Sequence, residues 1–73
     1  MHIDTEIHSE KYILTELKMG GILREIMAGK PLVLESARNH IMGEIAYDSF
    51  IRLLKAGYLI KHQSANKIYY THY

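Results

Sequence analysis

The residues of this chain best suited to coordinating a metal ion are its five histidines, because the imidazole nitrogen is a common ligand of zinc and copper. None of them forms an H-x-x-H, H-x₃-H or H-E-x-x-H pattern, which would place two imidazoles on one helical face. The chain also lacks cysteine, so no thiolate can complete a ligand set. The sequence therefore predicts no metal site. The histidines are His2, His8, His40, His62 and His72.

Serines and carboxylates are the remaining candidates for chemistry, as nucleophiles or as acids and bases. None of the four serines stands in the strand-to-helix elbow that exposes a catalytic nucleophile. No acid is paired with a positioned base. The glycine pair Gly20-Gly21 is neither a dinucleotide fingerprint nor a Walker sequence. We therefore expect a protein that is not an enzyme and binds no cofactor.

Length and composition indicate one small globular domain. A chain of 73 residues buries about 60% of the surface that it exposes when unfolded. Without disulfides, its stability has to come from apolar packing, with or without a partner subunit. No apolar stretch approaches the roughly 20 residues that span a bilayer, and the amino terminus lacks a basic region followed by an apolar run. We expect a cytoplasmic protein without membrane association.

Charge is distributed unevenly along the chain. Residues 1–36 carry four lysines and arginines against six acids, a net charge of −2. Residues 37–73 carry five against two, a net charge of +3. Such asymmetry is typical of a domain with one end that faces an anionic partner.

The first predicted element covers residues 9–18. Its apolar residues recur at helical spacing, Ser9 can cap the helix, and Glu10 would meet the positive end of the helix dipole. A strand over residues 11–17 is the alternative. The apolar residues of this segment are Ile13, Leu14 and Leu17.

Two further helices are predicted on either side of a short extended segment. Residues 22–29 have apolar positions at i, i+1, i+4 and i+5, which favours an amphipathic helix that ends at Gly29. Residues 32–34 are too short for anything but an extended piece. The second helix of this pair, capped by Ser36, would follow the extended segment and run to about Met42.

The last third of the chain predicts a helix and a hairpin. A third helix covers residues 46–56 and stops at Gly57. Apolar and polar residues alternate afterwards, so residues 58–62 and 67–71 are expected to pair as antiparallel strands around a turn at residues 64–66.

This order of elements resembles that of the winged helix-turn-helix domain. Residues 47–60, YDSFIRLLKAGYLI, look like the third helix of such domains with the start of the wing. Residues 22–32, ILREIMAGKPL, are similar to the first helix and first strand. The resemblance covers about residues 20–72. It implies an α+β fold with a three-helix core and a C-terminal β-hairpin wing.

The resemblance also implies how the chain would bind double-stranded DNA. The third helix would enter the major groove, and the wing would reach the backbone or the minor groove. Arginine can form paired hydrogen bonds with guanine or phosphate, and lysine neutralises phosphate. Asn66 is expected at the turn for its tolerance of left-handed backbone. The candidate contacts are Arg38, Tyr47, Asp48, Arg52, Lys55, Lys61, His62 and Lys67.

On this interpretation residues 20–73 form the winged-helix domain, and residues 1–19 are an additional amphipathic segment. A domain with so few cations binds DNA weakly, because each neutralised phosphate releases one counterion. We therefore expect a homodimer. Ile13, Leu14 and Leu17 would contact the second subunit, or else cover the domain's own core.

Two functions follow from these observations. The first is a sequence-specific DNA-binding regulator of transcription, of prokaryotic, plasmid or viral type. The alternative is a winged-helix module that binds another protein, such as an adaptor or an inhibitor from a mobile element, and does not bind DNA. The near-neutral third helix favours the alternative, and the positive C-terminal half favours DNA.

Overall fold

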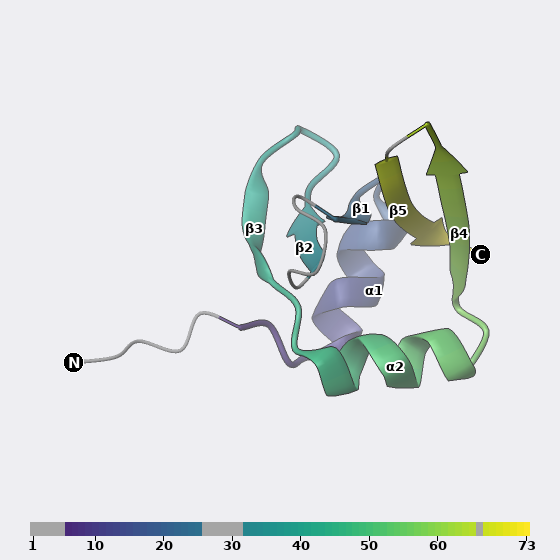
Figure 1. The fold of residues 1–73 in the computed structure, drawn as a ribbon. Coiled ribbons are helices and arrows are strands. Elements are labelled where there is room, and N and C mark those ends of the chain that lie inside the picture. Colours follow the sequence, from purple (N-terminus) through teal and green to yellow (C-terminus); the bar gives the residue numbers. More distant parts are fainter. Residues whose placement is uncertain (1–5, 26–31, 66) are drawn as a thin grey trace.

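The computed structural model describes residues 6–25, 32–65 and 67–73. In these residues the chain forms two helices and a five-stranded sheet (Figure 1). No helix in this part of the chain is long and apolar enough to cross a membrane. The elements in chain order are α1 (Glu10–Lys18), β1 (Ile22–Glu25), β2 (Leu32–Glu35), β3 (Ile41–Glu44), α2 (Tyr47–Lys55), β4 (Leu59–Ser64) and β5 (Lys67–His72).

The sheet has the strand order β3-β2-β1-β5-β4, and all neighbouring strands are antiparallel. The short strand β1 is central, with β2 on one side and the C-terminal strand β5 on the other. Figure 1 shows α2 across one end of the sheet, whereas the β2–β3 and β4–β5 turns lie at the opposite end. The sheet therefore joins the two halves of the chain.

Helix α1 packs on one face of the sheet, and α2 adds to the same core from the end of the sheet. Leu23 of β1 lies opposite Leu34 of β2 and opposite Tyr70 of β5, so these three side chains share a face. Leu23 and Leu34 are fully buried, and Phe50 of α2 meets the Tyr70 ring edge-on at 5.0 Å between centroids. The buried core cluster consists of Ile13, Leu17, Leu23, Leu34, Ile45, Leu53 and Leu59.

Helix α1 begins and ends with local hydrogen bonds that its sequence supplies. The Ser9 side chain accepts from the backbone N–H of Tyr12, which satisfies one donor of the first turn. At the other end, the N–H groups of Gly20 and Gly21 donate to Leu17 and Glu16, the Schellman pattern. Gly20 has φ +103°, the left-handed conformation that this pattern requires.

Helix α2 ends in the same way and is anchored at its start by the N-terminal segment. Gly57, with φ +83°, and Tyr58 donate to Leu54 and Leu53 in a second Schellman pattern. At the start, Ile7 forms a parallel bridge with Ile45. The chain before α1 therefore runs beside the entry to α2.

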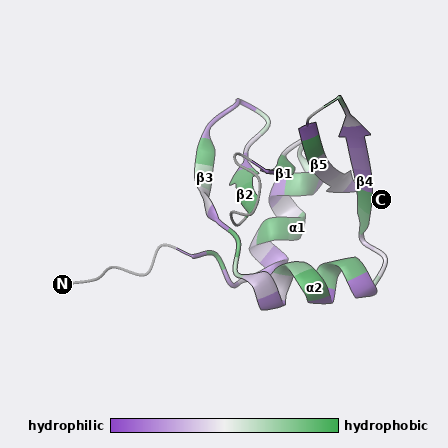
Figure 2. Ribbon diagram, in the orientation of Figure 1, coloured by the Kyte–Doolittle hydropathy of each residue, from purple (hydrophilic) through white to green (hydrophobic). Residues whose placement is uncertain are grey.

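The β4–β5 hairpin continues past the described part of β1. The hairpin has six cross-strand pairs, whereas β1 pairs with β5 at Tyr69 and Tyr70. The outer pairs, Gln63–Ile68 and Ser64–Lys67, lie towards the turn, beyond the two residues of β5 that pair with β1. Figure 2 shows that β4 changes from hydrophobic at its start to hydrophilic towards the turn.

The prediction of a winged helix-turn-helix with a three-helix core is wrong, because a five-stranded antiparallel sheet takes the place of two of the helices. The expected helix over residues 22–29 begins as strand β1, and residues 26–29 lie outside the described part. Leu23 is buried whereas its neighbours Ile22 and Arg24 are half-buried, the alternation of a strand. Pairing on both sides of β1 decides the conformation of this segment.

The expected helix from Ser36 to Met42 is also wrong. Ser36 is a capping residue, but its side chain accepts from the N–H groups of Arg38 and His40 and so stabilises a hairpin turn. Asn39 completes the turn with φ +66°. The apolar residues Ile41 and Met42 then form β3, at the edge of the sheet, where both are exposed.

The remaining elements are confirmed. Residues 10–18 form a helix and not the alternative strand, residues 32–34 are extended within β2, and α2 lies where the third helix was expected. The hairpin also forms, with strands slightly longer than predicted, but it belongs to a sheet and not to a helical bundle. Ala65 has the left-handed backbone of the turn, with φ +51°, and Asn66 lies outside the described residues.

Gly21→Ala is expected to destabilise the fold. A Cβ at this position would lie 2.8 Å from the carbonyl oxygen of Glu35 and 2.9 Å from that of Glu16, and both are backbone atoms. Such overpacking costs about 1–3 kcal/mol in free energy of unfolding, measurable by thermal or urea denaturation. Met19→Ala is the control, because Met19 is exposed and adjacent. Equal stability of the Gly21→Ala variant and the wild type would contradict the close approach of α1 and β2.

Candidate nucleic-acid interface

The residues expected to contact DNA lie at two ends of the molecule. Tyr47, Asp48, Arg52 and Lys55 belong to α2, at one end of the sheet (Figure 1). Arg38 lies in the turn between β2 and β3, at the opposite end. The eight candidates therefore do not form one continuous surface. Lys61, His62 and Lys67 belong to the β4–β5 hairpin.

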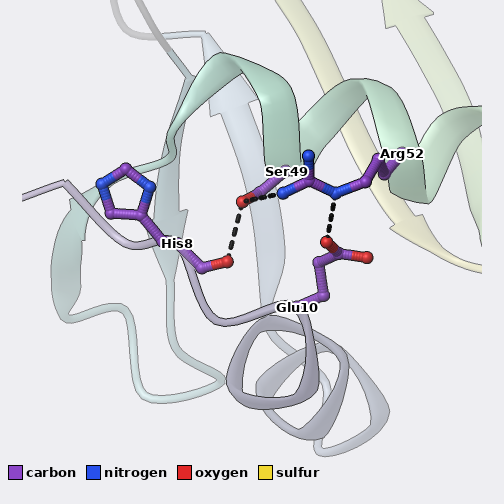
Figure 3. A network of polar contacts seen from close by, with 4 residues as sticks. All are labelled: His8, Glu10, Ser49 and Arg52. Atoms are coloured by element: carbon purple, nitrogen blue, oxygen red, sulfur yellow. Dashed lines mark hydrogen bonds and ion pairs between the residues drawn. The ribbon is translucent and has the colours of Figure 1, made fainter.

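Arg52 belongs to a network of polar contacts that joins α2 to the N-terminal segment (Figure 3). Its Nε donates to the Glu10 carboxylate at 2.5 Å, and its Nη2 donates to Ser49 Oγ at 3.4 Å. Ser49 is fully buried, and its hydroxyl donates to the His8 carbonyl oxygen at 2.7 Å. The network therefore connects the first turn of α1 with the middle of α2.

The ion pair of Arg52 with Glu10 has an electrostatic consequence. Chiefly the hydrogen bond that Arg52 donates to Glu10, and also the negative charge of Glu10, raise the pKa of the Arg52 guanidinium above its ordinary value. Arg52 is thus a permanent cation whose charge is compensated within the chain. A phosphate or a guanine would have to compete with Glu10 for this side chain, which weakens the case for Arg52 as the main DNA contact.

The hairpin residues divide between the two faces of the sheet. Lys61 lies opposite Tyr70, on the face that carries the core. His62 lies opposite Tyr69 and Ser64 opposite Lys67, so these four side chains share the outer face, turned away from the helices. The rings of His62 and Tyr69 stack at 4.7 Å with an interplanar angle of 8°.

Two further contacts position the outer face of the hairpin. His62 Nε2 is hydrogen-bonded to Thr71 Oγ1 at 2.8 Å, which sets the orientation of the imidazole ring. Arg24 of β1 lies opposite Tyr69, in the same cross-strand row as Tyr69 and His62. Its guanidinium forms an ion pair with Glu35. The predictions from sequence did not include Tyr69 and Arg24. The two-residue alternation in β5 indicated a face for Tyr69, but nothing local indicated that Arg24 would lie beside it.

The β4–β5 hairpin is free of acidic side chains. The chain has no Asp or Glu after Asp48, whereas it has Arg52, Lys55, Lys61 and Lys67. Lys61 and Lys67 are exposed. We call strands β4 and β5, residues 59–72, the basic hairpin. Its described part combines uncompensated lysines with tyrosine, histidine, serine and threonine side chains.

Ile13, Leu14 and Leu17, the residues expected to contact a second subunit, pack against the core of the same chain. Ile13 is fully buried and Leu17 nearly so, and Leu14 is partly buried against the same cluster. Of the two roles considered for this segment, the structure shows the cover over the chain's own core. A dimer formed through these three residues stays a prediction.

Within the described residues, no group of three histidine or acidic side chains lies close enough to hold a metal ion. No family model, curated protein or solved structure matches this chain. The winged-helix resemblance therefore has no support from related proteins, and the functional argument rests on the residues themselves.

Ser49→Ala is expected to destabilise the protein by about 1–3 kcal/mol, because it leaves the His8 carbonyl without its buried donor. Chemical denaturation measures this loss. Arg52→Ala is the matched control from the same network, and its effect is expected to be smaller because solvent screens the exposed ion pair with Glu10. A larger loss of stability for Arg52→Ala than for Ser49→Ala would contradict this assignment.

Proposed function

We propose that this protein binds nucleic acid, with double-stranded DNA as the favoured ligand, through the basic hairpin. The observation that carries the proposal is the β4–β5 hairpin, which carries exposed Lys61 and Lys67 and has no acidic residue in positions 59–72. The major groove of DNA admits a two-stranded antiparallel ribbon as well as a helix. The proposed mode therefore requires no recognition helix.

The chemistry of the ribbon suits both parts of DNA recognition. Lys61 and Lys67 neutralise phosphates and supply affinity that falls as salt is raised. Ser64 and His62 share a face with Lys67 and carry groups that hydrogen-bond with phosphates or base edges. A protein that occupies a DNA site in this way acts as a regulator of transcription.

The alternative function, a module that binds another protein, is favoured by a separate observation. Arg52 is engaged with Glu10. The outer face of α2 exposes Tyr47 and Leu54, an aromatic and an aliphatic side chain that a protein partner can cover. The two functions use separate surfaces, because the β4–β5 turn and α2 lie at opposite ends of the sheet.

Removal of a hairpin lysine tests the proposal. The full chain is titrated into fluorescently labelled duplex DNA at several salt concentrations, and anisotropy reports the affinity. Lys61→Ala and Lys67→Ala are each expected to weaken binding to all sequences alike and to reduce the slope of log affinity against log salt by about one unit. Lys18→Ala, which changes an exposed lysine of α1, is the control and should leave the slope unchanged.

Two outcomes would overturn the proposal. The first is wild-type protein that does not bind duplex DNA at low salt. The second is a pair of folded hairpin variants whose affinity and salt slope equal those of the wild type. Stronger competition by single-stranded than by duplex DNA would keep the hairpin as the interface but change the ligand.

A further inference from the structure

Helix α2 carries a second apolar surface that the core of the chain does not cover. Tyr47 and Leu54 are 72% and 40% exposed, and Ile51, which is half-buried, lies between them on the same side of the helix. The three residues are spaced by four and three, which aligns them along one face. We call these three residues the outer stripe.

The outer stripe exists because the apolar part of α2 is wider than the part that packs on the sheet. Ser49 and Leu53 point inward and are buried, and Phe50 packs against Tyr70. The polar residues Asp48, Arg52 and Lys55 occupy the remaining side. An amphipathic surface helix needs one apolar stripe for its own core. The additional stripe on α2 is therefore available to a partner.

We infer that the partner is a second copy of this chain, packed through the outer stripe with the two α2 helices antiparallel. In that arrangement the start of one stripe lies beside the end of the other. Tyr47 then packs against Leu54 of the second copy, and the two Ile51 side chains meet at the centre. By symmetry the contact between Tyr47 and Leu54 occurs twice.

The charges beside the stripe are complementary to themselves in the same orientation. Asp48 and Lys55 are seven residues apart, so they flank the stripe on one side, in the first and last turns of α2. Antiparallel packing brings the first turn of one helix beside the last turn of the other. Asp48 of each copy then faces Lys55 of the other copy, which gives two equivalent ion pairs. A parallel arrangement would instead place Asp48 level with Asp48 and Lys55 level with Lys55, so neither side chain would face an opposite charge.

The extent of the stripe predicts a weak dimer. Helix α2 has nine residues, and the stripe has three side chains, which makes an interface at the small end of specific protein–protein contacts. Monomers and dimers should therefore exchange as the protein concentration changes. This inference concerns α2 alone and does not depend on DNA binding by the basic hairpin.

The mass of the protein in solution tests the inference. Sedimentation velocity over a concentration series should show the wild-type chain change from monomer to dimer. Tyr47→Ala and Leu54→Ala remove exposed side chains and should leave folding intact while they raise the dissociation constant at least about tenfold. Met19→Ala removes an equally exposed apolar side chain from the end of α1 and should leave self-association unchanged.

Charge reversal tests the antiparallel orientation. Asp48→Lys makes the flank of the stripe wholly positive, and Lys55→Asp makes it wholly negative. Each variant alone should dimerise less than the wild type, because like charges then face each other. An equimolar mixture of the two should restore dimers, because opposite charges meet again at both positions. Lys18→Asp, which reverses the last-turn lysine of α1, controls for the helix-dipole effect of Lys55→Asp.

Three outcomes would overturn the inference. One is a wild-type chain that stays monomeric throughout the concentration series. Another is a dimer whose strength does not change in folded Tyr47→Ala and Leu54→Ala variants. The third is a mixture of the two charge variants that associates no better than either alone, while both retain their circular-dichroism spectra. None of these outcomes affects the DNA titration, so this inference and the proposed function can fail independently.

Discussion

The pairing of strand β1 on both its edges is the interaction on which the rest of the structure depends. β1 has four residues, yet it joins β2 to β5, which comes from the other end of the chain. Leu23 lies at the centre of this arrangement, fully buried and aligned with Leu34 and Tyr70. Bringing β5 to β1 closes a long loop, and the burial of this shared apolar face offsets the entropy lost. The helix α1 packs on the same two strands.

The position of each helix then follows from a close local contact. Gly21 lets the end of α1 approach the backbone of β2, where a larger residue would collide. The buried hydroxyl of Ser49 holds α2 to the segment before α1. Together these contacts fix which side of α2 faces inward, and they leave its outer stripe and the basic hairpin as separate surfaces. A chain this small thus presents two separate surfaces, the basic hairpin and the apolar outer stripe of α2.

The elements with strong local signals were predictable from sequence. Ser9 caps α1, Gly57 ends α2, and the alternation after Gly57 makes a hairpin, because each of these features is decided within a few residues. The candidate site was predictable in part for the same reason: Lys61, His62 and Lys67 were assigned to the hairpin. The winged-helix interpretation failed at residues 22–25 and 36–42. A short apolar run does not distinguish a strand from a helix by periodicity, and the Ser36 side chain caps a turn as readily as a helix.

The sequence alone determined the absence of acids after Asp48 and the lysines of the last third of the chain. These properties do not change with the fold. Only the tertiary structure decided that Leu23 belongs to a central strand, that Glu10 forms an ion pair with Arg52, and that Ile13 and Leu17 face the core of their own chain. The physical reason is that strand pairing and burial depend on segments far apart in sequence, and their free energy exceeds the weak local preferences of four-residue segments.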